Sequence, residues 1–307
     1  MDEKDINLRQ LIDALWNGKI FIIIFTSIFV ITSVFYSLQL PNKYLSYSSL
    51  TSSKSEASSL SSLAGSSLGG LASLAGVNLG QEQTSDTQIV IEIMQSWGFI
   101  EEFIKENNLE VKLVAVNGWN RDTNELIIDP EIYDSQNSKW LRDKTKNKSS
   151  EPSSWELYQA FTSILSVSQD SLNSLVTVSI EYYSPQVAKE LVDLFIKSVN
   201  EYMRLRKLQS SNANIEYLKE QVSKTSTNEI KAVFYRIIED EIKNKMLAEV
   251  SYEYSFITVQ KAMIPEQKIG PKRFQIVASL TLFAGLLSLI IVLVMHFSNK
   301  KLIFTKD

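Results

Sequence analysis

The stretch SPQVAKELVDLFIKSVNEYMRLRKLQSSNANIEYLKEQV, residues 184–222, decides the fold of this 307-residue chain. From Val187 onward its apolar residues recur every three or four positions, apart from one polar gap at 210–214. Ser184 is a favoured helix N-cap residue, and Pro185 is favoured at the first helical position. The pattern predicts one helix of about 38 residues, roughly 60 Å long, whereas the mean helix has about 11 residues.

A second helix follows the long one and is expected to return beside it. Residues 224–227, KTST, interrupt the apolar spacing, and Ser226 with Glu229 has the spacing of a capping box. The apolar row of this second helix is Ile230, Phe234, Ile238, Ile242 and Met246. The two segments together predict a long helical hairpin.

Strand signals lie on both sides of this hairpin. Residues 163–167 and 175–182 precede it, and the second of these, LVTVSIEY, alternates apolar and polar side chains. Residues 256–264 follow the hairpin, and residues 43–50 give a weaker signal. We expect these segments to form a small sheet.

The remaining segments of the middle region are more varied. Asp86 or Thr87 is expected to cap a helix that runs to Asn107. Residues 117–154 are polar and are expected to be irregular. Residues 51–85 are rich in Ser, Leu and Gly, which favours a flexible linker, yet their leucines recur at three- to five-residue steps. We expect part of this segment to form a short amphipathic helix.

Two long apolar runs flank the middle region. Residues 20–40 contain no charged residue, and residues 274–297 contain no Asp, Glu, Lys or Arg. About 20 apolar residues in a helix span the ~30 Å hydrocarbon layer. A cleaved signal peptide is the alternative for the first run, but that run is too long and ends in LQLP, without a small-x-small cleavage site. The sequence predicts two transmembrane helices.

Basic residues in the two short tails, 1–19 and 298–307, indicate the orientation. They are Lys4, Arg9, Lys19, Lys300, Lys301 and Lys306. The positive-inside rule places both tails in the cytoplasm. Lys272 and Arg273 lie on the opposite side, but a large domain translocates largely regardless of its charge. Residues 41–273 are therefore expected to form one domain outside the membrane, which in a bacterium is the periplasm.

The topology predicts an α+β architecture. Both anchors enter the membrane from the same side, so the chain between them must return to where it began. A long helical hairpin and a small membrane-proximal sheet satisfy this requirement. A tall, thin protomer buries little of its aromatic surface alone, so we expect a homo-oligomer.

Motifs for catalysis are absent from the sequence. The chain has no cysteine, no GxxxxGK[ST] loop, no GxSxG elbow and no DxDxDG loop, and its single histidine, His296, ends the second apolar run. Glu239, Asp240 and Glu241 are better explained as a solvated helix face than as an acid pair. The net charge of −4 lacks a basic block for nucleic acid. We therefore expect no enzyme activity, no cofactor, no metal and no nucleic-acid partner.

Two groups of residues are candidates for binding or packing. Arg204, Arg206 and Lys207 form a basic cluster on the long helix, which either is solvated or contacts an anionic polymer or lipid phosphate. The second apolar run has small residues four apart, which permit close helix approach but are also common in membrane helices. These pairs are Thr281 with Gly285 and Ala284 with Ser288.

Several stretches resemble the chain-length determinant proteins, the Wzz-type polysaccharide co-polymerases. They are IxLxxLIDALWNGK (6–19), NGWN (117–120), EPSSWELYQAF (151–161), VSIEYYSPQVAKELVDLFIKSVNEYMR (178–204) and MIPEQKIGPKRF (263–274). The last is similar to the proline-containing exit motif before the second span, here Pro265, Pro271, Lys272 and Arg273. Family members often have more prolines at this point.

The resemblance implies a non-catalytic inner-membrane scaffold that regulates the chain length of a surface polysaccharide, lipopolysaccharide O-antigen being the expected one. It implies a homo-oligomeric ring, in contact with membrane lipid, beside a Wzy-type polymerase. That polymerase extends a polysaccharide linked to undecaprenyl diphosphate. Ten residues follow the second run, so the short form without a tyrosine-kinase domain is expected.

Two other functions share part of this architecture. A membrane adaptor for a separate tyrosine kinase or export channel in capsule or exopolysaccharide synthesis would have the same two anchors. Such an adaptor should present a larger cytoplasmic surface than these short tails. A coiled-coil adaptor of a drug or protein secretion system usually has one anchor, so the second apolar run argues against it.

Overall fold

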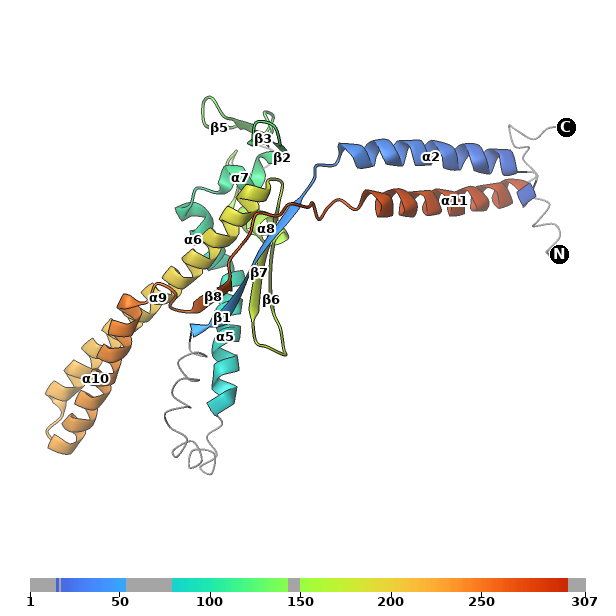
Figure 1. The fold of residues 1–307 in the computed structure, drawn as a ribbon. Coiled ribbons are helices and arrows are strands. Elements are labelled where there is room, and N and C mark those ends of the chain that lie inside the picture. The colour runs from blue at the N-terminus through green and yellow to red at the C-terminus, as the bar shows by residue number, and fades with distance from the viewer. Residues whose placement is uncertain (1–14, 17, 54–78, 143–149, 298–307) are drawn as a thin grey trace. The chain divides into compact units, whose positions relative to one another are not determined.

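The computed structural model describes residues 15, 16, 18–53, 79–142 and 150–297 and divides into two units (Figure 1). One unit combines the two ends of the chain, 1–43 and 268–307. The other unit is formed by residues 44–267. Helices and strands are both present, which confirms the expected α+β class.

The unit formed by the chain ends contains two apolar helices, α2 (Lys19–Gln39) and α11 (Arg273–Phe297). They lie side by side and run in opposite directions (Figure 1). Both are long and apolar enough to cross a membrane, and few of their residues are buried inside the protein. The two helices fit a two-pass membrane protein, as the charge-free runs predicted.

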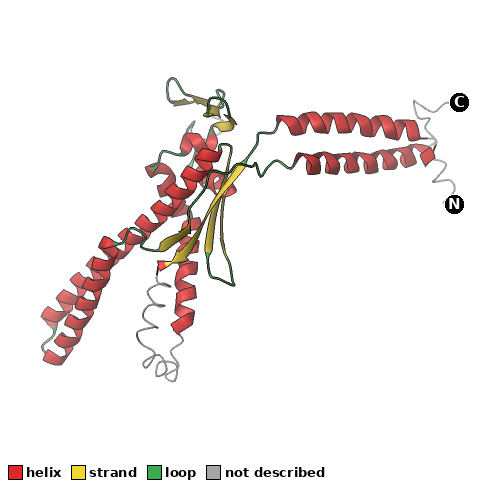
Figure 2. Cartoon of the chain, viewed as in Figure 1, coloured by secondary structure: helices red, strands yellow, loops and turns green. Residues whose placement is uncertain are grey.

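The second unit is built on a four-stranded antiparallel sheet (Figure 2). Its strands are β1 (Tyr44–Ser52), β6 (Leu165–Gln169), β7 (Val176–Tyr182) and β8 (Phe256–Gln260), in the order β6-β7-β1-β8. β1 pairs with β7 from Tyr44↔Tyr182 to Leu50↔Val176, and with β8 along its other edge. The first strand of the unit is therefore adjacent to its last.

The expected strands differ from the observed ones at their ends. The segment predicted at 163–167 begins only at Leu165, because helix α8 (Ser154–Ile164) continues to the residue before it. The segment predicted at 256–264 ends at Gln260, where its pairing with Ser49 ends. Both differences arise from neighbouring elements that local alternation cannot reveal.

The long helix and the returning helix are confirmed as α9 (Pro185–Lys224, 40 residues) and α10 (Asn228–Val250, 23 residues). They pack against each other as a hairpin (Figure 2). Ser184 caps α9 by accepting a hydrogen bond from the Val187 N–H. The predicted capping box at Ser226 is wrong: Thr227 is the N-cap residue and makes no side-chain cap bond. Glu229 is therefore only the second helical residue, whereas a capping box needs Glu at the third.

The apolar residues of α9 pack against two partners. The helix contacts β1 and β7 of the sheet as well as α10. The buried apolar residues of the first part are Ala188, Leu191, Val192, Phe195, Ile196 and Val199. One continuous helix thus belongs both to the sheet core and to the hairpin.

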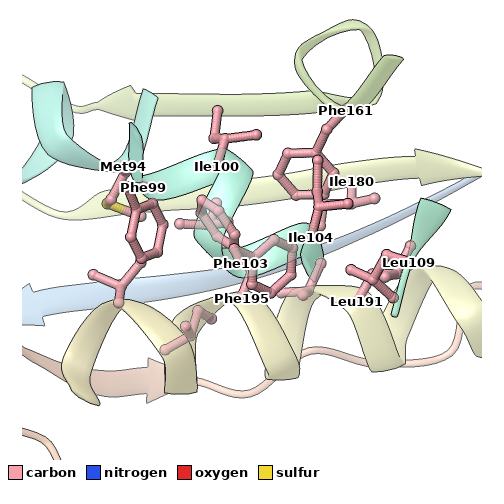
Figure 3. Close-up of a cluster of buried hydrophobic side chains, with 14 of the residues drawn as sticks. Met94, Phe99, Ile100, Phe103, Ile104, Leu109, Phe161, Ile180, Leu191 and Phe195 are labelled. Carbon is pink, nitrogen blue, oxygen red and sulfur yellow. The ribbon is translucent and has the colours of Figure 1, made fainter. Parts of the chain in front are cut away.

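The core lies between the sheet, α9 and the shorter helices α5 (Leu79–Gln95), α6 (Trp97–Glu106) and α8 (Figure 3). Phe103 is central to it, with ring centroids 5.1 Å from Phe161 and 5.3 Å from Phe195. The single helix predicted for 86–107 is wrong, because the backbone at Ser96 is extended and Ser96 caps α6. The break directs Phe99 and Phe103 together into the core.

Residues 117–154 are not irregular throughout, which corrects the expectation. Helix α7 (Glu110–Val114) leads into two small hairpins, β2 (Val116–Asn120) with β3 (Glu125–Ile128) and β4 (Tyr133–Asp134) with β5 (Lys139–Trp140). Asn124 and Ser138 adopt positive φ angles of 56° and 49° in the turns. Because turn-forming residues dominate this stretch, its short strands could not be predicted from the sequence. Most of the Ser/Leu/Gly segment, residues 54–78, lies outside the described residues, including its predicted amphipathic helix.

A buried polar side chain joins α9 to the last strand. Asn200, in the middle of α9, accepts hydrogen bonds from the backbone N–H groups of Ser255 and Phe256, both at 2.8 Å. Its amide donates to the Phe256 carbonyl at 2.9 Å. Asn200 is almost fully buried, so no water replaces these bonds easily. The side chain therefore fixes where the chain leaves α10 and enters β8.

We expect Asn200→Ala to lower the free energy of unfolding by about 2–3 kcal/mol, because it leaves three backbone groups without their partner. Asn212→Ala, at an exposed position of the same helix, is the matched control and should change it by at most about 0.5 kcal/mol. Urea unfolding of the detergent-solubilised full chain, followed by circular dichroism, measures both. Equal effects of the two substitutions would contradict this role for Asn200.

Candidate functional site

The exit motif lies against the segment that leaves the first apolar helix. The Lys43 N–H donates to the Gly270 carbonyl at 3.0 Å, and the Ile269 N–H donates to the Lys43 carbonyl at 2.9 Å. This isolated antiparallel bridge joins the two chain segments at the ends of α2 and α11. Pro265 and Pro271 are half-buried on either side of the bridge in the sequence.

The two cations of the exit motif have different environments. The Arg273 guanidinium donates to the Leu40 carbonyl and to Asn42 Oδ1, both at 3.3 Å. Leu40 is the C-cap of α2, where unpaired carbonyls carry partial negative charge, so a cation is favourable there. Lys272, in contrast, is exposed. Arg273 therefore ties the two helices together, and Lys272 is the more accessible of the two charges.

The basic cluster on α9 is close in sequence, but its side chains have different partners. Arg204 binds Glu201 through two hydrogen bonds of 2.7 and 2.9 Å, which lower the pKa of the Glu201 carboxyl. Lys207 lies 3.0 Å from a carboxylate oxygen of Glu241 on α10. Arg206 lines a shallow, open pocket together with residues of α5. The structure thus does not bring the three charges to one point.

The carboxylates at 239–241 are divided between solvent and the hairpin interface. Glu239 pairs with Lys243 at 2.8 Å on the exposed face of α10. Glu241 accepts a 2.6 Å hydrogen bond from the buried Ser211 hydroxyl as well as the bond from Lys207. These two bonds, the Ser211 bond first, lower the pKa of Glu241. Glu241 therefore joins α9 to α10, a role that the sequence analysis did not assign.

The small residues of α11 lie at different depths against α2. Ala284 and Ser288 are fully buried, whereas Thr281 and Gly285 are half-buried. A Cβ at Gly285 would meet no atom within 4 Å, so this glycine is not needed for a close approach. The tight approach is elsewhere: a Cβ at Gly18 would lie 2.5 Å from the Val292 side chain. Sequence spacing within one helix could not identify that contact.

The hairpin carries the largest group of exposed apolar side chains in the described part of the second unit. Those on α10 are Ile230, Val233, Tyr235, Ile237, Ile242, Met246, Leu247 and Val250. Leu205 and Tyr217 on α9 are exposed as well. Single exposed apolar residues are ordinary, but extended apolar patches indicate interaction surfaces. The hairpin is therefore a candidate protein–protein surface.

The described residues contain no group of three or more His, Cys, Asp or Glu side chains that could hold a metal ion. The features that stand out are instead the exit segment, the packed pair of apolar helices and the exposed hairpin. Each is a surface for anchoring or association.

Comparison with known proteins supports the resemblance drawn from the sequence motifs. Residues 4–107 match the family model described as Wzz, chain length determinant protein. None of the curated proteins compared with the chain is similar to it.

Two solved structures are similar over most of the chain, but at a low level. A full-length bacterial polysaccharide co-polymerase is 14% identical, with 95% of this chain and 98% of that chain covered and a TM-score of 0.39. A fragment of WzzB, a polysaccharide co-polymerase from Salmonella Typhimurium, is 14% identical, with 75% and 100% covered and a TM-score of 0.28. TM-scores this low do not establish a shared fold. The Wzz model matches residues 4–107 of the 307, so the likeness to this family covers about a third of the chain.

Proposed function

We propose that this protein is a non-catalytic inner-membrane scaffold that regulates the chain length of a surface polysaccharide made by a Wzy-type polymerase. The match of residues 4–107 to the chain length determinant model carries the proposal. The two apolar helices and the absence of catalytic motifs from the sequence support it. Lipopolysaccharide O-antigen is the proposed polymer, extended on undecaprenyl diphosphate.

The proposed topology places both chain ends in the cytoplasm and residues 41–273 in the periplasm. The bridge between Lys43 and Gly270 supports it, because it requires α2 to end and α11 to begin on the same side of the membrane. The lysines and arginine of the two tails favour the cytoplasm for the opposite ends. Four residues, 40–43, separate the end of α2 from the start of β1. The sheet is therefore the proposed membrane-proximal part of the domain.

The exposed hairpin supports a homo-oligomer. Its apolar side chains lie on more than one side of α10, so α9 alone cannot cover them. A second copy of the chain offers the same surface in return, as symmetric assemblies require. A ring of such hairpins would give the polymerase a repeated surface to contact without any chemistry of its own.

Deletion of the gene should change the length distribution of the polysaccharide chains while polymer is still made, because a regulator biases the polymerase without forming bonds. Leu205→Pro should reproduce the deletion, since a proline in mid-helix costs about 3 kcal/mol and kinks α9. Asn212→Ala, at an exposed polar position of the same helix, is the control and should leave the distribution unchanged. Gel electrophoresis of the surface polysaccharide, with immunoblots for protein level, makes the comparison. Complete loss of polymer, or an unchanged ladder in the deletion strain, contradicts the proposed function.

The detergent-solubilised protein should be a homo-oligomer larger than a dimer, and Val233→Asp with Ile237→Asp should reduce its mass. A carboxylate buried without a partner at a contact between copies costs several kcal/mol. The control is Leu172→Asp, at a position that is 94% exposed in the turn between β6 and β7. Light scattering with detergent mass subtracted gives the stoichiometry. A monomeric wild type, or a hairpin variant of unchanged mass, counts against the assembly.

A further inference from the structure

Three aromatic side chains gather on the outer face of α6 and α8. The ring centroids of Trp97 and Trp155 are 5.5 Å apart at 70°, and those of Trp155 and Tyr158 are 5.4 Å apart at 32°. Trp97 is 48% exposed and Trp155 is 49% exposed. The opposite faces of the same helices carry Phe99, Phe103 and Phe161 into the core. The outer aromatic group is therefore additional to the packing that holds the helices in place.

Hydrogen bonds hold these rings in position. The Trp97 indole N–H donates to Ser154 Oγ at 2.6 Å, and the Tyr158 hydroxyl donates to the Gln95 carbonyl at 3.2 Å. Ser153 begins α8 with a complete capping box, so the backbone below Trp155 is also fixed. A surface whose rings are already oriented loses little side-chain entropy when it binds a ligand.

Two ion pairs of described residues lie on the helix and the segment that carry the aromatic group. Glu101, one helical turn after Trp97, pairs with Lys105 at 2.5 Å. Arg142 donates to both carboxylate oxygens of Glu156, at 3.1 and 3.2 Å. Each of these two carboxylates is thus paired with a cation, so the two pairs add no net charge beside the rings to attract a phosphate, a nucleic acid or an acidic peptide. These pairs instead offer hydrogen-bond donors and acceptors to a neutral ligand.

The size of the aromatic surface favours a small ligand unit over a protein. An aromatic side chain has about 150–250 Å² of surface, so two half-exposed indoles and part of a phenol offer roughly 300 Å², whereas a stable interface takes about 800 Å² from each partner. A sugar ring has an apolar face of C–H groups, which the negative face of an aromatic ring attracts. Its hydroxyl groups project sideways, toward a polar rim.

We propose that Trp97, Trp155 and Tyr158 form a platform that binds neutral sugar rings of the polysaccharide whose length the protein regulates. The identity of the ligand rests on the proposed function, and the platform itself rests on the geometry of the three rings. Through this contact the scaffold would hold the growing chain directly, in addition to any contact with the polymerase.

The test measures binding of polysaccharide purified from the source strain to the full chain in detergent, by isothermal titration calorimetry. Trp97→Ala with Trp155→Ala should weaken the affinity at least tenfold. Trp155→Phe retains an aromatic face and should stay within about threefold of wild type. Trp119→Ala is the matched control, because it removes a tryptophan that packs against Tyr44 in a different part of the unit. Circular dichroism of each variant verifies that it is folded.

The outcomes separate the platform from the proposed function. Loss of affinity in the double variant only, with Trp119→Ala unaffected, supports the platform. Absence of saturable binding to wild type, or equal affinity of the double variant, overturns it. A double variant that dissociates into monomers but binds polysaccharide normally also overturns it, because the rings would then contact another copy. If the deletion strain keeps its ladder while binding still depends on both tryptophans, the platform stands and the regulatory function falls.

Discussion

The pairing of β1 with β8 is the constraint on which the rest of the structure depends. The chain enters the second unit at Tyr44 and leaves it after β8, and these two strands are neighbours in the sheet. The chain between β1 and β8 must therefore return to the side of β1 on which β8 pairs. Asn200 secures the return, because it binds the backbone on both sides of Phe256 at the start of β8.

The long helix α9 connects the four-stranded sheet to the exposed hairpin. Its buried residues from Ala188 to Val199 belong to the core beside β1 and β7, and Lys207 and Ser211 further along bind Glu241 on α10. Because α9 is one uninterrupted helix, a kink in the hairpin half changes its direction relative to the sheet half. For the proposed scaffold, a fixed distance between the sheet and the tip of the hairpin would matter more than reactive groups.

Sequence periodicity predicted the elements that are long and strongly patterned. The two apolar runs, the helix at 185–224 and the strand at 176–182 follow directly from charge-free length, helical spacing and alternation. The break at Ser96 and the hairpins after Val114 were missed because tertiary packing and turn residues decide them. The roles of Asn200, Glu241 and Gly18 were also missed, since each depends on a partner at least 30 residues away in the sequence.

At the candidate surfaces, too, local sequence predicted some features, whereas others depend on residues that are distant in the sequence. The exit motif could be named from its prolines and basic residues, but only the structure distinguishes Arg273, which binds the end of α2, from the exposed Lys272. Arg204, Arg206 and Lys207 were predicted to form one cluster because they lie within four positions of the sequence, yet the helix directs them to different partners. The aromatic platform combines tryptophans of two helices, Trp97 and Trp155, which are 58 positions apart in the sequence. No local sequence motif could therefore predict it.

A pair of introduced cysteines tests the pairing of β1 with β8, and the proposed location of these strands in the periplasm, most directly. The natural chain has no cysteine, and Thr51 lies opposite Ile257 across β1 and β8, so Thr51→Cys with Ile257→Cys adds the only thiols. Disulfides form in the oxidising periplasm but rarely in the cytosol. Non-reducing electrophoresis of cells, with Thr51→Cys plus Tyr217→Cys as the control pair, should show a spontaneous intrachain disulfide in the first variant only. Thiols that stay reduced in both variants would contradict the pairing of β1 with β8 or the proposed periplasmic location of these strands.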